Sequence, residues 1–438
     1  MTALLYIAGV LIFVVGLAAS VGLHELGHLI PGKLYDVKVT QYFVGFGRTL
    51  WSTRKGETEY GVKAIPLGGY VKLVGMIPPG EGEDETKVRA RNTGMFAQLV
   101  DDARNAEYEH VGPHDHDRLF YKLPWWKKVV VMGAGVATNL VLAFVLFGVV
   151  FMGYGVLTPT QTVNTVSACV KVVSGGDEPG ECTGSDPESP AKKAGLMPGD
   201  RIVAFNGTTI TDYGQLQRLI RGNEGGKATI VVERHGERKT LTTDTAVRKD
   251  LPDLDNPDKT VTAGFLGISP VEVRERQGLG YTINTMASGT WDTIKAIGSM
   301  PTKIYHVARA AVGLEKRDPN GPQSVVGAGR VAGEIASVHD ASLMERFTSI
   351  LLLLASLNLF LGLINLVPLP PFDGGQIATT LVEAVRRGVA RVRGRPDPGG
   401  LDAAKLLPLT YAMAAVILVV SVILIYADLV VPVHLPSN

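Results

Sequence analysis

His24-Glu25-Leu26-Gly27-His28 ends the first long apolar segment of the chain and matches the pattern HExxH. Residues four apart lie on one face of a helix, so the two imidazoles can reach the same ion. Neutral imidazole is a good ligand for Zn²⁺, and the carboxylate between them can accept a proton from water at the metal. About 0.01 such matches are expected by chance in a chain of this length. The pattern therefore predicts a zinc site with His24 and His28 as ligands and Glu25 as the catalytic base.

The composition is that of a membrane protein. Charged residues make up 19% of the 438 residues, against about 25% in soluble domains, and the mean hydropathy is +0.18. The 43 Lys and Arg residues balance the 42 Asp and Glu residues, so we expect no nucleic-acid partner. Ionisable groups at a membrane span are costly and are usually functional, which disfavours a chance helix end with snorkelling histidines.

Four apolar segments are long enough to cross a bilayer as helices, for which about 20 residues suffice. No charge precedes the first segment and no small-x-small site follows it, so we expect a retained helix and not a cleaved signal peptide. Lys and Arg gather in the loops at 31–127 and 376–408, and the positive-inside rule places these loops in the cytoplasm. Both termini and residues 157–345 would then face outside, with the active site near the cytoplasmic side. The four segments are 3–29, 129–156, 347–367 and 411–431.

The outer region begins with a soluble insert of short strands and turns and continues, over 271–345, with a helical, amphipathic, glycine-interrupted segment. The insert has the turn residues and alternation that such strands require. We predict a short helix, a Pro-Gly-Asp turn, a strand and an Asn-Gly turn over 189–207, a helix over 215–221, and a hairpin over 228–244.

The loop after the first apolar segment has two parts. Residues 39–75 alternate as strands do, with a turn at Leu67-Gly68-Gly69. Residues 80–117 are polar and charge-rich, and we expect them to be partly disordered. Three histidines in this stretch raise the possibility of a second metal site, but its polar, loop-like composition favours a solvated loop. They are His110, His114 and His116.

Two histidines do not complete a catalytic zinc site, which needs a third protein ligand and an open position. The extension HExxHxxGxxH is absent, because Pro31 and Leu34 stand where it requires Gly and His. The candidate is Asp373, in the segment Asn365-Leu-Val-Pro-Leu-Pro-Pro-Phe-Asp-Gly-Gly375. Its prolines and glycines break the helix at membrane depth, where such backbone must be buried in protein or line a cavity. The alternative is an ordinary helix end with an aspartate at the water interface.

These motifs together resemble the site-2 protease family of intramembrane zinc metalloproteases. HExxH at the first span, a strand-rich insert and Asn-x-x-Pro-x-Pro-x-x-Asp-Gly near the last spans follow in the family's order over nearly the whole chain. The resemblance implies that His24, His28 and Asp373 bind zinc and that Glu25 is the base. It further implies that Asn365 contacts substrate. The bacterial branch that cleaves membrane-bound anti-sigma factors is the most similar.

Further substrate contacts are expected from the same resemblance and from the strand pattern. The Gly-rich family motif of the second span is similar to residues 133–139, which suggests a role for Asn139, although Val136 stands where the family often has proline. Gly68 and Gly69 belong to the strand-like loop 62–74, our candidate edge for pairing with an unwound substrate strand. Phe372 replaces the family's usual leucine before Asp-Gly.

The insert resembles a PDZ domain over the segment Ala194-Gly-Leu-Met-Pro-Gly-Asp200. The family resemblance implies that this domain admits substrate after a first cut by another, site-1-type protease. Cys169 and Cys182 lie in the outer region, where a disulfide is favoured over two free thiols. The expected partners are a single-pass membrane substrate resembling an anti-sigma factor, the upstream protease and membrane lipid, and the expected location is the bacterial cell membrane.

The expected fold is a polytopic α-helical membrane protein of about four transmembrane helices. It carries an inserted extracytoplasmic PDZ-like α+β domain and a β-hairpin loop on the cytoplasmic side. The expected boundaries are 1–30 (first helix), 31–127 (cytoplasmic loop with a charged insertion), 128–156 (second helix), 157–270 (PDZ-like domain), 271–345 (helical segment), 346–375 (third helix with the Asp-Gly motif), 376–408 (cytoplasmic loop) and 409–432 (fourth helix).

The predicted function is hydrolysis of peptide bonds within transmembrane segments of pre-trimmed membrane proteins such as anti-sigma factors. Alternatives are clearance of remnant signal peptides and trimming of prenylated tails, the latter disfavoured by the insert and the late Asp-Gly motif. An inactive PDZ-bearing scaffold is disfavoured because all four chemical residues are intact. A transporter is disfavoured because the chain shows no paired repeats and has only four apolar segments.

Overall fold

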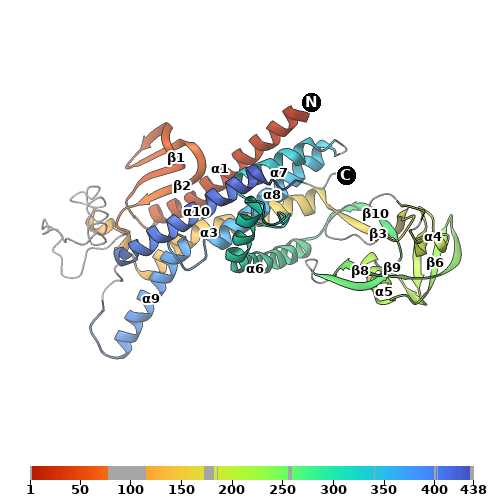
Figure 1. Ribbon diagram of the computed structural model, residues 1–438. Coiled ribbons are helices and arrows are strands. Elements are labelled where there is room, and N and C mark those ends of the chain that lie inside the picture. The colour runs from red at the N-terminus through yellow and green to blue at the C-terminus, as the bar shows by residue number, and fades with distance from the viewer. Residues whose placement is uncertain are drawn as a thin grey trace. The chain divides into compact units, whose positions relative to one another are not determined.

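The protein consists of two compact units. A computed structural model describes residues 2–76, 115–171, 182–184, 186–254, 259–339, 341–398, 401 and 403–434. One unit joins Met1–Tyr154 to Gly278–Asn438 and is mainly helical, and the other, Gly155–Gln277, is built mainly of strands (Figure 1). The strand unit is therefore an insertion in the helical unit, and its last strand extends past residue 270.

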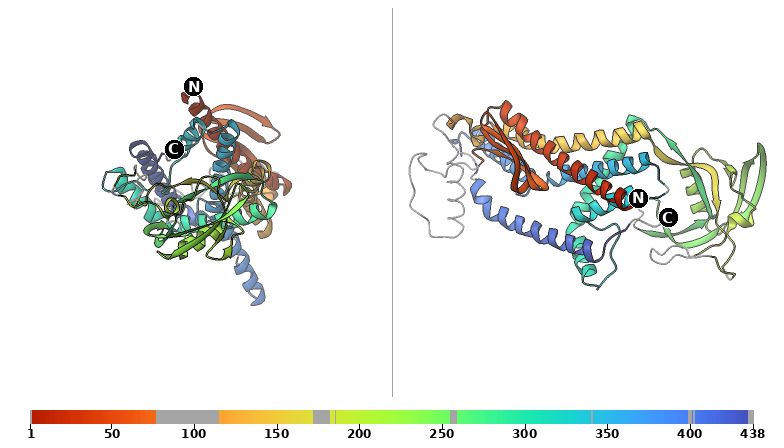
Figure 2. Two further views of the ribbon diagram at one scale, coloured as in Figure 1. Left: turned by 90° about the vertical axis from the view of Figure 1, so that its right-hand side faces the viewer. Right: turned by 90° about the horizontal axis from the view of Figure 1, so that it is seen from above.

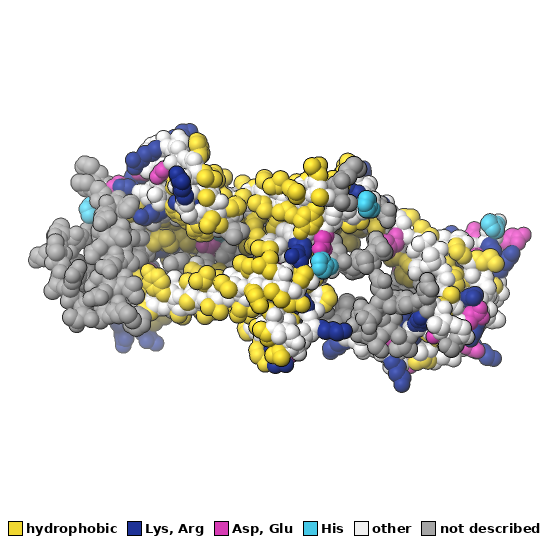
Figure 3. Space-filling view, turned by 45° about the horizontal axis from the view of Figure 1, so that its top comes forward, with side chains coloured by type: hydrophobic (Ala, Val, Ile, Leu, Met, Phe, Trp, Pro, Cys, Tyr) yellow, Lys and Arg dark blue, Asp and Glu magenta, His cyan; other side chains and the backbone are white. Residues whose placement is uncertain are grey.

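Four helices of the helical unit are long and apolar enough to cross a membrane. They run in the same general direction in Figure 2, and hydrophobic side chains gather over them in the space-filling view of Figure 3. Helices that are apolar on all sides suit a lipid environment, and the prediction of a multi-pass membrane protein with a sheet domain is confirmed. The helices are α1 (Thr2–Leu34), α3 (Trp125–Gly148, continued by the π-helical turn Val149–Tyr154), α8 (Leu343–Ile364) and α10 (Leu407–Val430).

Small residues allow the helices to pack closely. A Cβ added at Gly16 of α1 would lie 2.6 Å from Leu354 Cδ1 of α8, so this leucine side chain packs directly on the glycine and would have to shift for a larger residue. Lipid gives helices little hydrophobic reason to associate, and close backbone approach and hydrogen bonds replace it. One such bond runs from Asn358 Nδ2 to Ser20 Oγ over 2.9 Å, between fully or nearly buried groups. Both contacts join α8 to the half of α1 that leads to His24.

The helical unit has further helices and turns. A capping box between Ser342 and Glu345 starts α8, because serine and glutamate satisfy each other's free N–H groups. In Figure 1, α9 leaves the other helices obliquely. The other helices among the described residues of this unit are α6 (Leu279–Ala311), α7 (Val325–Ser337) and α9 (Asp373–Val392), with short 3₁₀ turns at His116–Arg118, Phe120–Lys122 and Ala403–Leu406.

A long hairpin of two strands, β1 (Val39–Lys55) and β2 (Thr58–Leu73), folds back on itself beside α1 (Figure 1). Residues 41–44 pair with residues 69–72 on one side and with residues 59–62 on the other. Residues 69–71 therefore lie at an edge, since no other described strand pairs with their far side. The strands predicted over 39–75 are present, while residues 77–114 lie outside the described part of the chain.

The strand unit has one main sheet in the order β10-β3-β4-β6-β7, with β5 paired to β4 and a separate β8–β9 pair. The helix predicted over 215–221 is α5 (Tyr213–Gly222), and the predicted hairpin turns at His235 and Gly236, which both have positive φ. A buried core that includes Ile202, Phe205 and Leu216 fills the unit. The other elements are β3 (Val156–Val166), α4 (Pro190–Lys193), β4 (Arg201–Phe205), β5 (Thr208–Thr209), β6 (Lys227–Arg234), β7 (Glu237–Asp244), β8 (Ala246–Pro252), β9 (Thr260–Phe265) and β10 (Ile268–Glu275).

The predicted Pro-Gly-Asp turn is held by a buried ion pair. Both carboxylate oxygens of Asp200 accept from Arg234, over 2.6 and 2.7 Å, and Oδ2 also accepts from the Met197 N–H over 2.9 Å. Burial raises the pKa of the Asp200 carboxyl, but the Arg234 guanidinium and the Met197 N–H outweigh burial and hold that pKa below its usual range. These hydrogen bonds to the Asp200 carboxylate therefore hold the turn in place.

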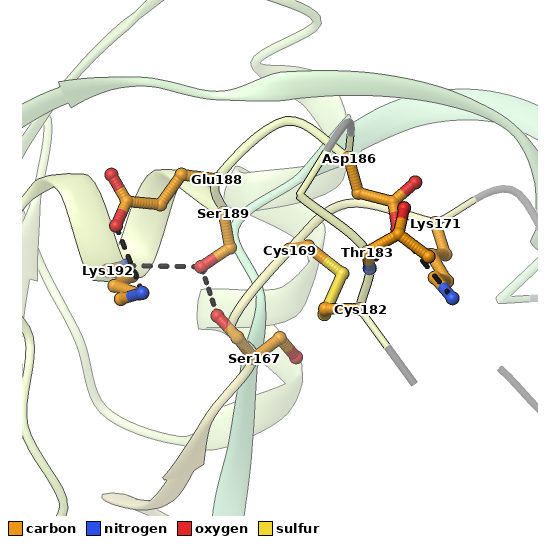
Figure 4. The surroundings of a disulfide bond; sticks show 9 residues. All are labelled: Ser167, Cys169, Lys171, Cys182, Thr183, Asp186, Glu188, Ser189 and Lys192. Atoms are coloured by element: carbon orange, nitrogen blue, oxygen red, sulfur yellow. Dashed lines mark hydrogen bonds and ion pairs between the residues drawn. A yellow bond between two sulfur atoms is a disulfide. The ribbon is translucent and has the colours of Figure 1, made fainter. Parts of the chain in front are cut away.

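A disulfide joins Cys169 to Cys182 next to the start of α4 (Figure 4). In the same view, the Ser189 hydroxyl donates to the Ser167 carbonyl and accepts from the Lys192 N–H over 3.2 Å. Ser189 is therefore the N-cap that begins the short helix predicted over 189–207. The disulfide links the segment that follows β3 to the segment that precedes α4.

Candidate active site

One face of α1 presents two imidazoles to the protein interior. His24 and His28 are 9% and 4% exposed, and their Nε2 atoms lie 3.2 Å apart. The HExxH helix thus aims one ring nitrogen from each histidine at a common point, as the spacing predicts.

The third candidate ligand, Asp373, lies directly after the break between α8 and α9. Asp373 is the first residue of α9, and its Oδ2 lies 3.2 Å from His24 Nε2 and 3.3 Å from His28 Nε2. The turn before it is tight: the Gly374 N–H donates to the Asn365 carbonyl over 2.7 Å. A Cβ at Gly375 would lie 2.6 Å from the Pro370 nitrogen, so the Pro/Gly sequence is needed for the turn to close.

The three atoms fit a tetrahedral metal ion. They form a nearly equilateral triangle with sides of 3.2, 3.2 and 3.3 Å. Ligand atoms that lie about 2.0 Å from a tetrahedral ion are about 3.3 Å from each other, so the triangle matches one face of such a site and leaves a fourth position open. Among the described residues, no hydrogen-bond donor satisfies the buried Asp373 Oδ2. A cation would satisfy it, and two imidazoles with a carboxylate are a donor set that suits Zn²⁺.

Helix α3 fixes the orientation of His28. His28 Nδ1 lies 2.8 Å from the Val131 carbonyl oxygen, so the ring donates through Nδ1 and keeps the Nε2 lone pair for the metal. The two helices touch at glycines: a Cβ at Gly27 would lie 2.6 Å from Thr138 Oγ1 and 2.8 Å from Gly135 Cα. A Cβ at Gly135 would overlap His28 Nε2, the ligand atom itself. The close approach of α3 is therefore part of the site.

Glu25 lies next to the triangle of candidate ligands and is not part of it. It is half-buried on α1, turned by about 100° from His24 around the helix. Strand β2 passes beside it: a Cβ at Gly69 would lie 3.1 Å from Glu25 Cγ, and the Val71 backbone faces the Glu25 carboxyl. The carboxylate thus stands between the ligand triangle and an edge strand.

The predicted substrate-contact residues lie on three different elements of the helical unit. Gly69 borders Glu25, and Gly68 precedes it with a φ of 91°, a conformation that favours glycine. Asn365 ends α8, directly before the turn to Asp373. Asn139 is buried on α3 where α8 crosses it at Gly362, and its Oδ1 lacks a hydrogen-bond partner within the described residues. Their contact with substrate stays a prediction.

Several supporting residues are not evident from the sequence. Glu383 of α9 pairs with Lys128 at the start of α3 over 3.4 Å, and both side chains are less than 10% exposed. Nothing local to either residue signals this pairing, because they lie far apart in the chain. Gly135 is an exception, because it lies in the Gly-rich run of the second span, and this run is a signal that the sequence provides. Of the loop histidines, His116 lies in a 3₁₀ turn, and His110 and His114 fall outside the described residues.

We predict that Gly135→Ala abolishes metal binding while Gly133→Ala does not. Both glycines lie inside α3, and alanine is the better helix former at either position by about 1 kcal/mol. A Cβ at Gly133 meets nothing within 4 Å, whereas a Cβ at Gly135 overlaps His28 Nε2. Metal analysis of the purified proteins should find about one zinc per chain in wild type and Gly133→Ala, and almost none in Gly135→Ala. Equal zinc in both variants would contradict the close approach of α3.

Comparison with known proteins agrees with this geometry. The model of peptidase family M50 matches residues 12–395. The zinc metalloprotease Rip1 of Mycobacterium tuberculosis strain Erdman is 33% identical, and the match covers 99% of this chain and 100% of that protein. Rip1 of Mycolicibacterium smegmatis is also 33% identical, with 97% and 98% covered. The matched family region includes both histidines, Glu25 and Asp373.

The buried His/His/Asp triangle fits zinc, and these relatives are named for zinc. The chain therefore belongs to peptidase family M50, the site-2 protease family, and is a multi-pass membrane zinc metalloprotease.

Proposed function

We propose that this protease cuts peptide bonds inside the transmembrane segments of membrane proteins that another protease has already trimmed. One observation carries the proposal: the ligand triangle and Glu25 are built on α1, a helix long and apolar enough to cross a membrane. A substrate must therefore reach the site within the bilayer. Single-pass proteins of the anti-sigma-factor type are the substrate class that the bacterial branch of the family suggests.

His24, His28 and Asp373 would hold the zinc, and Glu25 would move the proton. Zinc, when bound, supplies Lewis acidity that makes water a nucleophile near neutral pH and polarises the scissile carbonyl. The Glu25 carboxylate accepts a proton from the attacking water and afterwards delivers it to the nitrogen of the leaving amine. Its half-buried position between the triangle and β2 leaves it accessible to a substrate backbone.

The edge at residues 69–71 offers a place for the substrate strand. A helical substrate must unwind before its peptide bond can be attacked, and in lipid each freed N–H and C=O then needs a partner. Pairing with an exposed strand edge supplies such partners. Because Gly69 and Val71 border Glu25, a strand added there would carry its backbone past the base. Asn365, which ends α8, would form a hydrogen bond with a further backbone group of the substrate.

The strand unit would act as the filter for trimmed substrates. Its order of elements, with α4, the Pro-Gly-Asp turn and α5 around one sheet, supports a PDZ-like identity. We place this unit and both termini outside the cell and the loops 31–127 and 376–408 in the cytoplasm, in a bacterial plasma membrane. Clearance of remnant signal peptides by the same site is the alternative activity. An inactive scaffold is disfavoured, because it would not need the His/His/Asp triangle.

We predict that Glu25→Gln keeps zinc and loses cleavage. Gln has the shape of Glu but cannot accept the proton, so the rate should fall by about 10²- to 10⁴-fold. The assay uses purified full-length protein in lipid vesicles with a pre-trimmed anti-sigma-factor-type substrate, and a remnant signal peptide in parallel. Zinc retained without loss of cleavage would remove Glu25 from the mechanism. Cleavage of the signal peptide alone by wild type would favour the alternative substrate.

We predict that Asn365→Ala slows cleavage by about fivefold to tenfold, the effect of losing one hydrogen bond to the substrate. The Asn365 backbone carbonyl, which accepts from the Gly374 N–H, is kept in this variant. Zinc content should therefore match wild type, which separates a lost substrate contact from a distorted turn. An unchanged rate in the same vesicle assay would exclude the Asn365 side chain as a clamp.

We predict that replacing residues 156–276 by a short Gly/Ser linker relaxes selectivity. The strand unit has its own core, so the helical unit should keep its fold and its zinc. The shortened protein should cut untrimmed substrate at a rate close to that for trimmed substrate, whereas wild type should cut only the trimmed form. If the shortened protein still rejects untrimmed substrate, the filter lies elsewhere.

A further inference from the structure

Helix α9 has an apolar face that no described part of the protein covers. Five branched side chains on it are between 43% and 88% exposed. They recur at spacings that place them on one side of the helix. A soluble surface rarely exposes such a continuous apolar strip without a partner. The five are Leu381, Val382, Val385, Val389 and Val392.

The opposite side of α9 is fixed against the protein. Glu383 is buried there against Lys128 of α3, and Thr380 and Ala390 are buried on the same side. Glu383 and Val385 lie about 200° apart around the helix. Breaking a buried ion pair leaves an uncompensated charge, so α9 cannot roll to hide its apolar face. That face must point away from the protein.

Arginines border the apolar face. Arg386 lies about 40° beyond one edge of this face and Arg391 about 80° beyond the other, and Arg393 and Arg395 follow at the end of the helix. Arg387 is already engaged by Glu383 over 3.0 Å. α9 is not among the helices apolar enough to cross the membrane. An amphipathic helix with apolar residues on one side and arginines at its borders suits the boundary between lipid headgroups and acyl chains.

We propose that α9 lies in the headgroup boundary of an anionic leaflet, with its apolar face in the acyl chains and its arginines on lipid phosphates, and that this contact strengthens metal binding. The coupling follows from the chain itself. Asp373, the third ligand, is the first residue of α9, and the Lys128–Glu383 pair joins the middle of α9 to the helix that orients His28. Holding α9 against the bilayer therefore holds Asp373 in the triangle.

The burial of α9 can be measured by a single label on the full-length protein. Both native cysteines are in the disulfide, so Val389→Cys and, as the matched control, Arg391→Cys each provide one thiol. These positions are about 200° apart on the helix. A fluorophore at 389 should be quenched by nitroxide-bearing lipids, and one at 391 by aqueous iodide. Equal access of iodide to both, or disulfide cross-linking of two copies through position 389, would overturn the proposal.

The dependence on anionic lipid has its own readout, the zinc Kd from competition with a chelator. The Kd should be at least about fivefold lower in vesicles that contain phosphatidylglycerol than in phosphatidylcholine alone, the lower end of usual coupling between sites. Changing Arg386, Arg391, Arg393 and Arg395 to Gln should remove the difference, and changing them to Lys should keep it, because Lys retains the charge. The same Kd in both vesicles, or an undiminished difference in the Gln variant, would overturn the coupling.

Discussion

The candidate active site depends on one contact, the approach of the Asp373 carboxylate to the two imidazoles of α1. The three polar groups have candidate ligand atoms that lie 3.2 to 3.3 Å apart, and the two histidines are buried while Asp373 is partly buried. Burying a carboxylate in such surroundings costs several kcal/mol unless an opposite charge compensates it. A zinc ion bound there would supply this charge and also the chemistry. The same ion would therefore join α1 to the start of α9 and create the site.

Helix α3 is the common support of both partners. It orients His28 through the Val131 carbonyl, approaches the ligand atom at Gly135, and binds α9 through Lys128. These residues are three to four positions apart and so follow one side of α3. The backbone can come this close only because glycine replaces a side chain at the crossing. The geometry of the candidate zinc site therefore depends on α3, which carries no candidate ligand, as much as on α1 and α9, which carry all three.

The sequence predicts what is local and leaves open what is long-range. HExxH fixes the relation of His24 to His28, because helical spacing alone brings them together, and four apolar segments suffice to predict four membrane helices. Asp373 can be predicted from the sequence because its Pro/Gly surroundings are unusual at membrane depth. The Lys128–Glu383 pair and the passage of β2 beside Glu25 cannot be predicted in this way, since they depend on the packing of segments far apart in the chain. No periodicity in either segment encodes such a contact.

For the proposed cleavage within the bilayer, the position of Glu25 between the candidate metal ligands and an edge strand would solve a problem that soluble proteases do not have. In water, an unwound peptide exchanges its hydrogen bonds with solvent, but within a bilayer each unpaired backbone group costs free energy. A protease in the membrane must therefore offer hydrogen-bond partners at the place where it offers a base. The hairpin meets this need because residues 41–44 already pair on both sides, which leaves residues 69–71 as the outer strand nearest Glu25. Substrate unwinding and proton transfer would then occur at one place on the protein.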